Sequence, residues 1–439
     1  MKKILWLLLV SLSLFSCDKE EVEVSQRHAG RTVLAFFWAD NNLNTDLLLN
    51  IGTMLQGMQS VTDSTALVVY WDGNSTNKEW KDPCILKFLS NGRGEINGVS
   101  AGVVTPLLQE VANIYDQYVK YCKGAGGSKP SNLSAVYSLL EIGTREKTYP
   151  SQNSTDKKVM QAVVADMLAC CPSDSYGIIL GSHGSGWLPN LSGSGRSIGQ
   201  DGAITNTICM PELAEALQAA NPQKFDFVLF DACMMGHAEV CYQLRNATDY
   251  CFASVVDVPA CGFPYGKVMS YLYKDNLNEY LSAVCDAYTN AFEGGLWGTM
   301  SAIDCTQMEN LASATREVLL AHEAALKGVI TSNLQEYGRK SDWRGNAYDM
   351  IQYVKMLCGG EVPATFAQQF SKTILYTGYV SDYTSIYYKI DGDNYCGMGM
   401  YIPNSSTSGK YALWNTYFKS SIAWYHAAGW ADTEPTWGK

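Results

Sequence analysis

The chain has 439 residues, a length that suits two or three domains or one large α/β unit. Hydrophobic residues make up 47% and charged residues 17% of it, which is the composition of a globular protein and excludes an intrinsically disordered chain. The formal net charge is −11, and Lys and Arg are not gathered into a stripe, so we expect no nucleic-acid partner. The five histidines leave few candidates for any histidine-dependent chemistry.

Residues 1–16 are typical of a signal peptide and not of the fold, because two lysines precede a short apolar run. The run ends in Leu14-Phe15-Ser16-Cys17, which resembles the lipobox of bacterial lipoproteins, where cleavage precedes a cysteine that then receives a diacylglycerol. The alternative is an ordinary secretory peptide that happens to contain a cysteine. The acidic tether at 17–30 favours the lipoprotein and resembles the surface-export signal of Bacteroidetes lipoproteins. We therefore expect Cys17 to carry a lipid as the only membrane attachment, with the protein in the cell envelope, on the exposed face of the outer membrane.

The body of the chain alternates buried strands with amphipathic helices. In chain order the patterns predict strand 32–38, helix 46–59, strands 65–71 and 85–89, helix 156–171, strand 176–180, helix 211–220, strand 225–230, a helix directly after Cys233, strand 250–256, helices 264–273 and 276–293, strand 298–303, helix 305–328 and strand 397–402. This alternation predicts an α/β fold with a mostly parallel central sheet. We divide it into a core at 31–265 and a C-terminal α/β part at 266–439 that packs on the core.

Two consecutive core strands end in reactive side chains, His183 and Cys233. The carboxyl ends of parallel strands meet at one edge of a sheet, where ligands bind, and a thiol needs a base such as imidazole to form its thiolate. Taken alone, the cysteine is explained as a small core residue and the histidine as a turn residue. Their placement on successive strand ends favours a catalytic pair. His237 competes as the base because it is near Cys233 in sequence, but in the predicted helix it lies one turn along and points to the side.

Three segments of the chain resemble motifs of the clostripain family of cysteine peptidases. Ser182-His183-Gly184-Ser185-Gly186-Trp187 is similar to the family's strand-His-Gly-Gly-Gly-Trp motif, and Asp231-Ala232-Cys233-Met234-Met235-Gly236 to its Asp-Ala-Cys-Leu-Met-Gly motif. Gly397–Pro403 resembles its late Gly-x-Ser-x-Tyr-Phe-Pro strand. The resemblance extends over most of residues 31–405, and it implies a caspase-like α/β/α sandwich in which 31–265 is the catalytic core and 266–439 the C-terminal extension.

The resemblance also implies roles for individual residues. Cys233 is the expected nucleophile and His183 the general acid–base that protonates the leaving amine. The backbone N–H groups of Gly184 and Cys233 are the expected oxyanion donors. This chemistry requires no metal and no cofactor, and nothing in the sequence indicates a calcium requirement.

Asp231 is the predicted specificity residue, because the family places there the acid that binds a basic P1 side chain. Residues 231 and 233 share a face of the strand, so the carboxylate is positioned to line a pocket beside the nucleophile. A buried carboxylate that faces Arg or Lys rejects neutral side chains. The alternative is an N-cap for the helix predicted after Cys233, a role that Asp fills readily.

The loop at 188–207, rich in Gly, Ser and Asn, contains Arg196-Ser197. Flexible loops are where proteases cut, and clostripain-like enzymes are activated by autocleavage after a basic residue between the histidine and the cysteine. Arg196 is the only Arg or Lys between His183 and Lys224, so it is the predicted processing site. The alternative is a passive surface arginine.

The sequence therefore predicts a hydrolase, a surface-anchored cysteine endopeptidase whose substrates are proteins or peptides with a basic P1 residue, Arg or also Lys. Two other functions stay open at this point. One is a binding lipoprotein on a catalytically silent peptidase fold, and the other is a caspase-like peptidase with a non-basic P1 preference.

Overall fold

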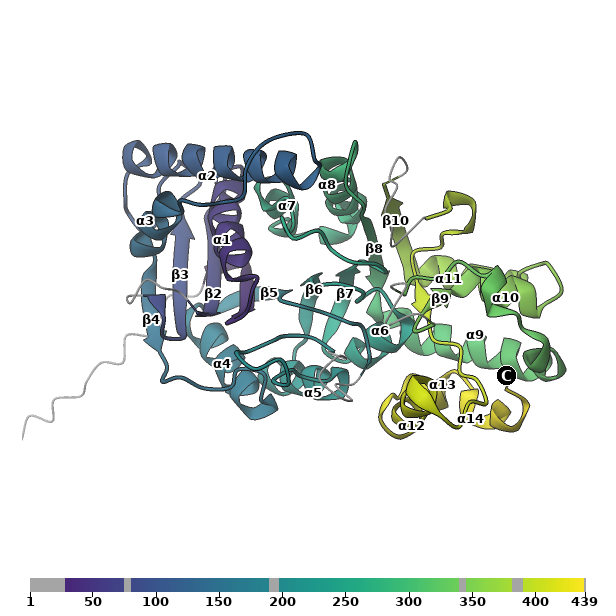
Figure 1. Ribbon diagram of the computed structural model, residues 1–439. Coiled ribbons are helices and arrows are strands. Elements are labelled where there is room, and N and C mark those ends of the chain that lie inside the picture. Colours follow the sequence, from purple (N-terminus) through teal and green to yellow (C-terminus); the bar gives the residue numbers. More distant parts are fainter. Residues whose placement is uncertain (1–27, 75–79, 189–196, 339–344, 381–389, 438–439) are drawn as a thin grey trace, which may run out of the picture.

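The computed structural model describes residues 28–74, 80–188, 197–338, 345–380 and 390–437 (Figure 1). A nine-stranded sheet forms its centre, with the strand order β10-β8-β7-β6-β5-β1-β2-β3-β4. The strands are β1 (His28–Ala39), β2 (Thr65–Gly73), β3 (Cys84–Ser90), β4 (Thr144–Thr148), β5 (Ser173–Gly181), β6 (Phe225–Asp231), β7 (Thr248–Ala253), β8 (Thr299–Asp304) and β10 (Ile374–Tyr379).

The middle of this sheet is parallel and both of its edges are antiparallel. Strands β2, β1, β5, β6 and β7 pair in parallel, whereas β3 and β4 on one side and β8 and β10 on the other run antiparallel to their neighbours. The parallel strands are continuous apolar runs because helices cover both of their faces. The predicted α/β/α class is confirmed. The antiparallel strands at both edges of the sheet are a feature that the sequence did not predict.

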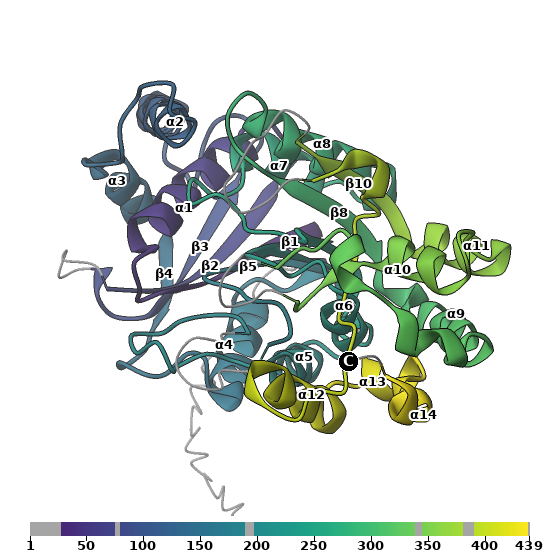
Figure 2. The same cartoon turned by 45° about the vertical axis from the view of Figure 1, so that its right-hand side comes forward.

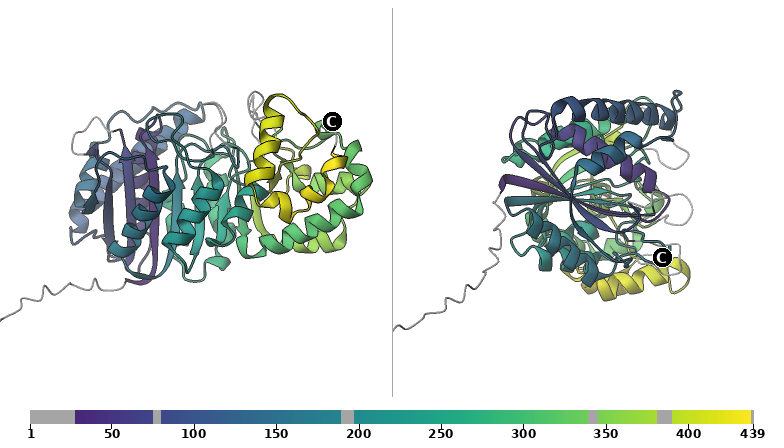
Figure 3. Two further views of the ribbon diagram at one scale, coloured as in Figure 1. Left: turned by 90° about the horizontal axis from the view of Figure 1, so that it is seen from below. Right: turned by 90° about the vertical axis from the view of Figure 1, so that its left-hand side faces the viewer.

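Two layers of helices enclose the sheet (Figure 3). One layer consists of α1 (Asn44–Met58), α2 (Ala101–Cys122), α3 (Ser134–Ile142), α7 (Tyr265–Leu272) and α8 (Leu281–Phe292). The other begins with α4 (Lys157–Cys170), α5 (Met210–Ala220) and α6 (Ala238–Leu244). Local signals start some of these helices: the Asp156 carboxylate accepts hydrogen bonds from the N–H groups of Lys158 and Val159 at the start of α4.

The C-terminal part adds β8 and β10 to the same sheet, and its helices after β8 lie beyond that edge, whereas α7 and α8 belong to the layer over the sheet (Figures 1 and 3). The helices beyond the edge are α9 (Met308–Ala321), α10 (Met350–Leu357), α11 (Ala364–Thr373), α12 (Gly409–Ser421), α13 (Trp424–Ala427) and α14 (Trp430–Thr433). A small second sheet pairs β9 (Tyr348–Asp349) with β11 (Gly399–Met400). Figure 2 shows α6 between the large sheet and α9 and α13, so the turn before α6 adjoins the C-terminal part.

Several expected elements differ in the structure. The helix predicted directly after Cys233 starts only at Ala238, and the predicted helix 305–328 divides into the 3₁₀ turn 305–307, α9 and the 3₁₀ segment 323–328. The predicted strand 397–402 reduces to β11. The elements that were not predicted are helices α2, α3 and α10 to α14 and strands β4, β9 and β10. No helix of the described ranges has both the length and the apolar character needed to cross a membrane.

Candidate active site

His183 and Cys233 leave adjacent strands of the sheet at the same level. Strands β5 and β6 pair in parallel with Gly181 opposite Asp231, and each reactive residue stands two positions further along its chain. The Ser182 N–H donates to the Asp231 carbonyl oxygen (3.3 Å), so the pairing continues past the last strand residue. The topology therefore brings the two predicted catalytic residues to one edge of the sheet, as the sequence predicted.

Exposure singles out the same two side chains. Within segments 181–188 and 231–240, every residue is buried except His183 and Cys233, which are partly exposed. An accessible thiol and imidazole on an otherwise buried framework are the arrangement that nucleophilic catalysis needs, because the framework holds them while substrate reaches them.

Gly184 lies directly against the backbone of the cysteine. A Cβ atom on Gly184 would be 2.6 Å from the Cys233 carbonyl oxygen, a distance at which something must shift. The Gly184 N–H makes no hydrogen bond to any residue that the structure describes. Because this N–H group lies beside Cys233 and has no other partner in the described chain, it is suited to bind an oxyanion that develops at that place.

Met234, which follows the nucleophile, holds a strained backbone. Its φ of +61° is in the left-handed region that disfavours residues with a Cβ atom, and its N–H donates to the Val256 carbonyl oxygen (2.9 Å). This turn delays the start of α6 to Ala238, with His237 as the N-cap residue. Helix α6 begins too far beyond Asp231 in the chain for this side chain to cap it, so the N-cap alternative for Asp231 is wrong.

The loop after β7 contacts the cysteine sulfur. The Val258 N–H donates to Cys233 Sγ (3.4 Å), and Sγ lies 3.9 Å from the Val258 carbonyl oxygen. The shorter contact, from the N–H, favours the thiolate, which is the nucleophilic form, whereas the longer one is a bond that the thiol donates to the carbonyl oxygen.

Asn42 orients the histidine, a contact that the sequence did not predict. His183 Nε2 and Asn42 Oδ1 are 2.7 Å apart. Because an amide oxygen only accepts, this contact favours the tautomer with the proton on Nε2, which leaves Nδ1 as the ring nitrogen available to accept a proton. The signal that could have found Asn42 is its position just after β1, the strand beside β5.

Asp231 is buried beside the nucleophile and bonded to the helix layer. Its Oδ2 accepts hydrogen bonds from Asn50 Nδ2 in α1 (2.9 Å) and from the Tyr265 hydroxyl in α7 (2.9 Å). Burial raises the pKa of Asp231 from 3.8 to about 6, and the Tyr265 hydroxyl and the Phe263 backbone oppose this rise only in part. The one charge that contributes to this pKa shift belongs to another acid, Asp46. A cation that reached this carboxylate would therefore supply the charge partner that it lacks among the described residues.

His237 does not compete as the catalytic base. It is the N-cap of α6, fully buried, and its ring lies between Gly186 and Gly399. Burial lowers the pKa of His237 to about 4, although the Val255 backbone favours its protonated form. The expectation that it lies one turn along a helix and points to its side was wrong, because the left-handed turn at Met234 intervenes.

The predicted processing and lipidation sites fall mostly outside the described residues. Arg196 and Cys17 lie outside them, whereas Ser197 is described and buried. Ser197 accepts a hydrogen bond from the Ser185 N–H (2.9 Å), and its hydroxyl donates to the Leu188 carbonyl oxygen (2.7 Å). The chain just after Arg196 is thus bound to the loop that carries His183.

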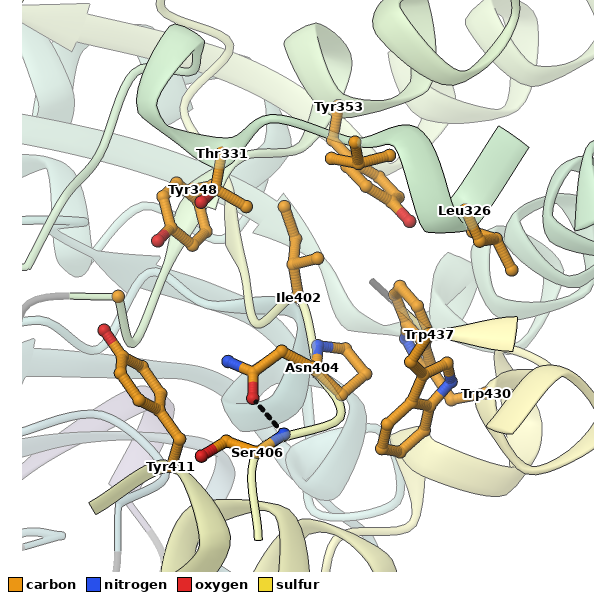
Figure 4. Close-up of a pocket in the computed structure, with 13 residues that line it drawn as sticks. Leu326, Thr331, Tyr348, Tyr353, Ile402, Asn404, Ser406, Tyr411, Trp430 and Trp437 are labelled. Atoms are coloured by element: carbon orange, nitrogen blue, oxygen red, sulfur yellow. Dashed lines mark hydrogen bonds between the residues drawn. The ribbon is translucent and has the colours of Figure 1, made fainter. Parts of the chain in front are cut away.

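A cavity of about 300 Å³ lies apart from these residues, in the C-terminal part (Figure 4). Tyr348 and Tyr411 stand on one side of it and Trp430 and Trp437 on the other, with Asn404 between them. No group of three or more His, Cys, Asp and Glu side chains in the described part of the chain is arranged to hold a metal ion.

Comparison with known proteins agrees with the motifs. The sequence model of the clostripain family matches residues 35–437. Clostripain from Hathewaya histolytica is 29% identical over 156 residues, which are 32% of this chain and 28% of clostripain, so the chain spans well under half of that relative.

Solved structures share the fold over almost the whole chain. A secreted C11 cysteine protease from Bacteroides thetaiotaomicron, in complex with an irreversible peptide inhibitor, is 24% identical with a TM-score of 0.66, and the match covers 92% of this chain and 99% of that one. An inactive zymogen of a C11 protease from Parabacteroides distasonis is 22% identical with a TM-score of 0.64, over 91% of this chain and 98% of that one. At these identities the likeness shows the caspase-like fold.

Proposed function

Because the chain belongs to the clostripain family of cysteine peptidases, we propose that it hydrolyses peptide bonds after Arg or Lys with a Cys233–His183 dyad. The observation that carries the proposal is the buried Asp231 carboxyl group two residues before the nucleophile, which has no cation beside it in the described chain. A guanidinium or ammonium group that enters beside Cys233 gains that carboxylate as its partner, whereas a neutral side chain leaves a buried charge unpaired.

The geometry supports a two-step reaction. His183 Nδ1 accepts the Cys233 thiol proton as Sγ attacks the scissile carbonyl carbon, and the N–H groups of Gly184 and Cys233 stabilise the oxyanion. The C–N bond breaks as His183 passes its proton to the leaving amine, which leaves an acyl group on sulfur. Water then attacks the thioester with His183 as the base, which releases the acid product and restores the thiol.

Peptide hydrolysis tests this proposal directly. A chain that begins at residue 18 is assayed with fluorogenic peptides that end in Arg, Lys, Ala or Asp, beside its Cys233→Ala variant. We expect Cys233-dependent cleavage of the Arg and Lys peptides, and slow or no cleavage of the other two. Cleavage of the Ala or Asp peptides at equal rates supports the caspase-like alternative instead, and no turnover before or after deliberate nicking supports the silent binding protein.

Activation by autocleavage between Arg196 and Ser197 is part of the proposal. Hydrogen bonds from Ser185 and Gly199 bind the segment after this point to the loop of His183, so a cut would leave the new chain start beside the catalytic histidine. We expect wild type to appear as two fragments, and Cys233→Ala and Arg196→Ala as intact chains. Wild type that remains intact yet active, or Cys233→Ala that is cut to the same extent, contradicts self-processing.

Anchoring by a lipid on Cys17, with the protein on the outer membrane surface, completes the proposed function. The secreted Bacteroides protease of the same fold supports a location outside the cytoplasm. We expect cells that express the full chain to incorporate an alkyne-labelled fatty acid into it, and Cys17→Ser to abolish the label. Equal labelling of both contradicts the anchor at Cys17.

A further inference from the structure

Three segments that are distant in the sequence meet beside the catalytic residues. They are the loop after His183 at Gly186 and Trp187, the start of α6 at His237 and Glu239, and the chain at the end of β11 at Gly399 and Tyr401. We call these six residues the clasp. Neither the proposed dyad nor the contacts of Asp231 involve any of them.

His237 fills the space where the three segments touch. A Cβ atom on Gly186 would lie 2.7 Å from His237 Nδ1, and one on Gly399 would lie 2.7 Å from His237 Cδ2. The Gly399 N–H also donates to the Gly236 carbonyl oxygen (3.0 Å), which aligns β11 with the turn. Only glycine on both sides lets an imidazole fit between the catalytic loop and the C-terminal strand.

Glu239 and Tyr401 make the second contact of the clasp. Both are fully buried, and Glu239 Oε1 accepts a hydrogen bond from the Tyr401 N–H (2.8 Å). The Tyr401 ring packs on Trp187 of the catalytic loop, with 4.9 Å between ring centroids, and its hydroxyl donates to Asn415 Oδ1 (2.8 Å). The Glu239 carboxyl group thus binds the backbone of Tyr401, and the ring of Tyr401 packs on Trp187 in the loop after His183.

The surroundings of Glu239 favour its neutral form. Its Oε2 has no hydrogen-bond partner among the described residues, and no Lys or Arg contributes to its pKa shift. Other titratable side chains at or around the clasp include His237, Tyr401, Tyr348 of β9, and Tyr411 and Tyr417 of α12, none of which is a cation at neutral pH. Burial raises the pKa of Glu239 to about 8, against the opposing effect of the Tyr401 N–H.

We propose that Glu239 is a positioning residue that, in its protonated form, fastens the C-terminal strand at Tyr401 against the two catalytic segments, so that peptidase activity depends on the C-terminal part and is lost when Glu239 ionises. A carboxylate at this place would put a buried charge on an unpaired oxygen, and the strand would separate from the turn. A displacement of about 1 Å at the catalytic loop is enough to reduce turnover about 100-fold. The kinetic part of this inference rests on the proposed peptidase activity, and the stability part does not.

The stability test uses Glu239→Gln, which keeps an acceptor for the Tyr401 N–H and cannot ionise. A raised carboxyl pKa in the folded state means that its stabilisation is complete below pH 4.5 and is lost as pH rises to about 8. Between pH 5 and pH 8 we expect the thermal midpoint of Cys233→Ala to fall by about 4–5 °C more than that of Cys233→Ala/Glu239→Gln. The matched control is Glu215→Gln in the Cys233→Ala chain, because Glu215 is an exposed glutamate of α5 whose carboxylate pairs with Lys157. Its thermal midpoint should change with pH as that of Cys233→Ala does. Parallel curves for the Glu239 variant and its parent overturn the proposal.

The kinetic test separates positioning from folding. At pH 7 we expect Glu239→Gln to keep kcat within about twofold of wild type and to retain activity above pH 8, where wild type loses it. Glu239→Ala should lower kcat at least tenfold with little change in KM. A Glu239→Gln variant that is inactive at pH 7, or that has the alkaline loss of wild type, contradicts the proposal even if Glu239→Ala fails to fold. A chain that cleaves no peptide at all refutes the proposed function and leaves the stability result to decide on the clasp.

Discussion

Replacing Asp231 by asparagine should make the protein more stable and less active. The change removes the charge while keeping an oxygen that accepts from Asn50 and Tyr265. Burial raises the pKa of Asp231 from 3.8 to about 6, and this difference corresponds to about 3 kcal/mol. The folded protein bears this cost whenever the carboxyl group is ionised.

The sign of the stability effect follows from the direction of the pKa shift. A carboxyl group with a raised folded pKa contributes its full stabilisation below pH 3.8, loses it progressively as pH rises, and has lost it above about pH 6. At pH 7 the Asp231→Asn variant should therefore exceed wild type in free energy of unfolding by about 1–3 kcal/mol, and near pH 4 the two should be nearly equal. Urea denaturation at both pH values measures this, with the exposed Asp63→Asn as the control.

The kinetic effect has the opposite sign. Loss of one member of a buried ion pair costs about 3–5 kcal/mol, so kcat/KM for an Arg peptide should fall about 10²- to 10⁴-fold. In wild type the same constant should rise with pH through about 6 as Asp231 ionises, and this rise should be absent from Asp231→Asn. A variant that retains Arg cleavage within threefold refutes Asp231 as the specificity residue. A variant that is less stable than wild type at pH 7 refutes the energetic reasoning.

Substitutions at three further positions test the geometry around Cys233. Gly184→Ala places a Cβ atom 2.6 Å from the Cys233 carbonyl oxygen, so kcat should fall at least tenfold, and a normal burst of acyl-enzyme would contradict the close packing. Met234→Gly and Met234→Ala both remove the buried side chain, but only alanine keeps a Cβ atom that is strained at φ +61°. In urea denaturation the glycine variant should therefore be the more stable by about 1 kcal/mol, and equal stability would argue against strain. Asn42→Ala removes the acceptor for His183 Nε2 at an exposed position, so kcat should fall about tenfold with the thermal midpoint unchanged; a loss of stability without a loss of kcat would show that Asn42 serves the fold instead.

The fold class and the meeting of His183 and Cys233 at one edge of the sheet could be predicted from the sequence because both depend on local patterns. Continuous apolar runs identified the parallel strands, since strands covered on both faces exclude polar residues. The reactive residues His183 and Cys233 follow two such runs directly, and the carboxyl ends of parallel strands meet at one edge whatever the connections between them. Helix α2, by contrast, was missed although Val104, Leu108 and Val111 repeat at helical spacing on its buried side.

Only the tertiary structure decided what surrounds that pair. The left-handed backbone at Met234 delays α6, and this turn, which depends on the bond from its N–H to Val256, separates Asp231 from the helix and buries His237. Asn50 and Tyr265 reach Asp231 from helices 181 and 34 residues away in the chain. Glu239 meets Tyr401 across 162 residues. Contacts between positions so far apart depend on how the helices pack on the sheet, and the hydrophobic pattern of a single sequence records which residues are buried without recording their partners.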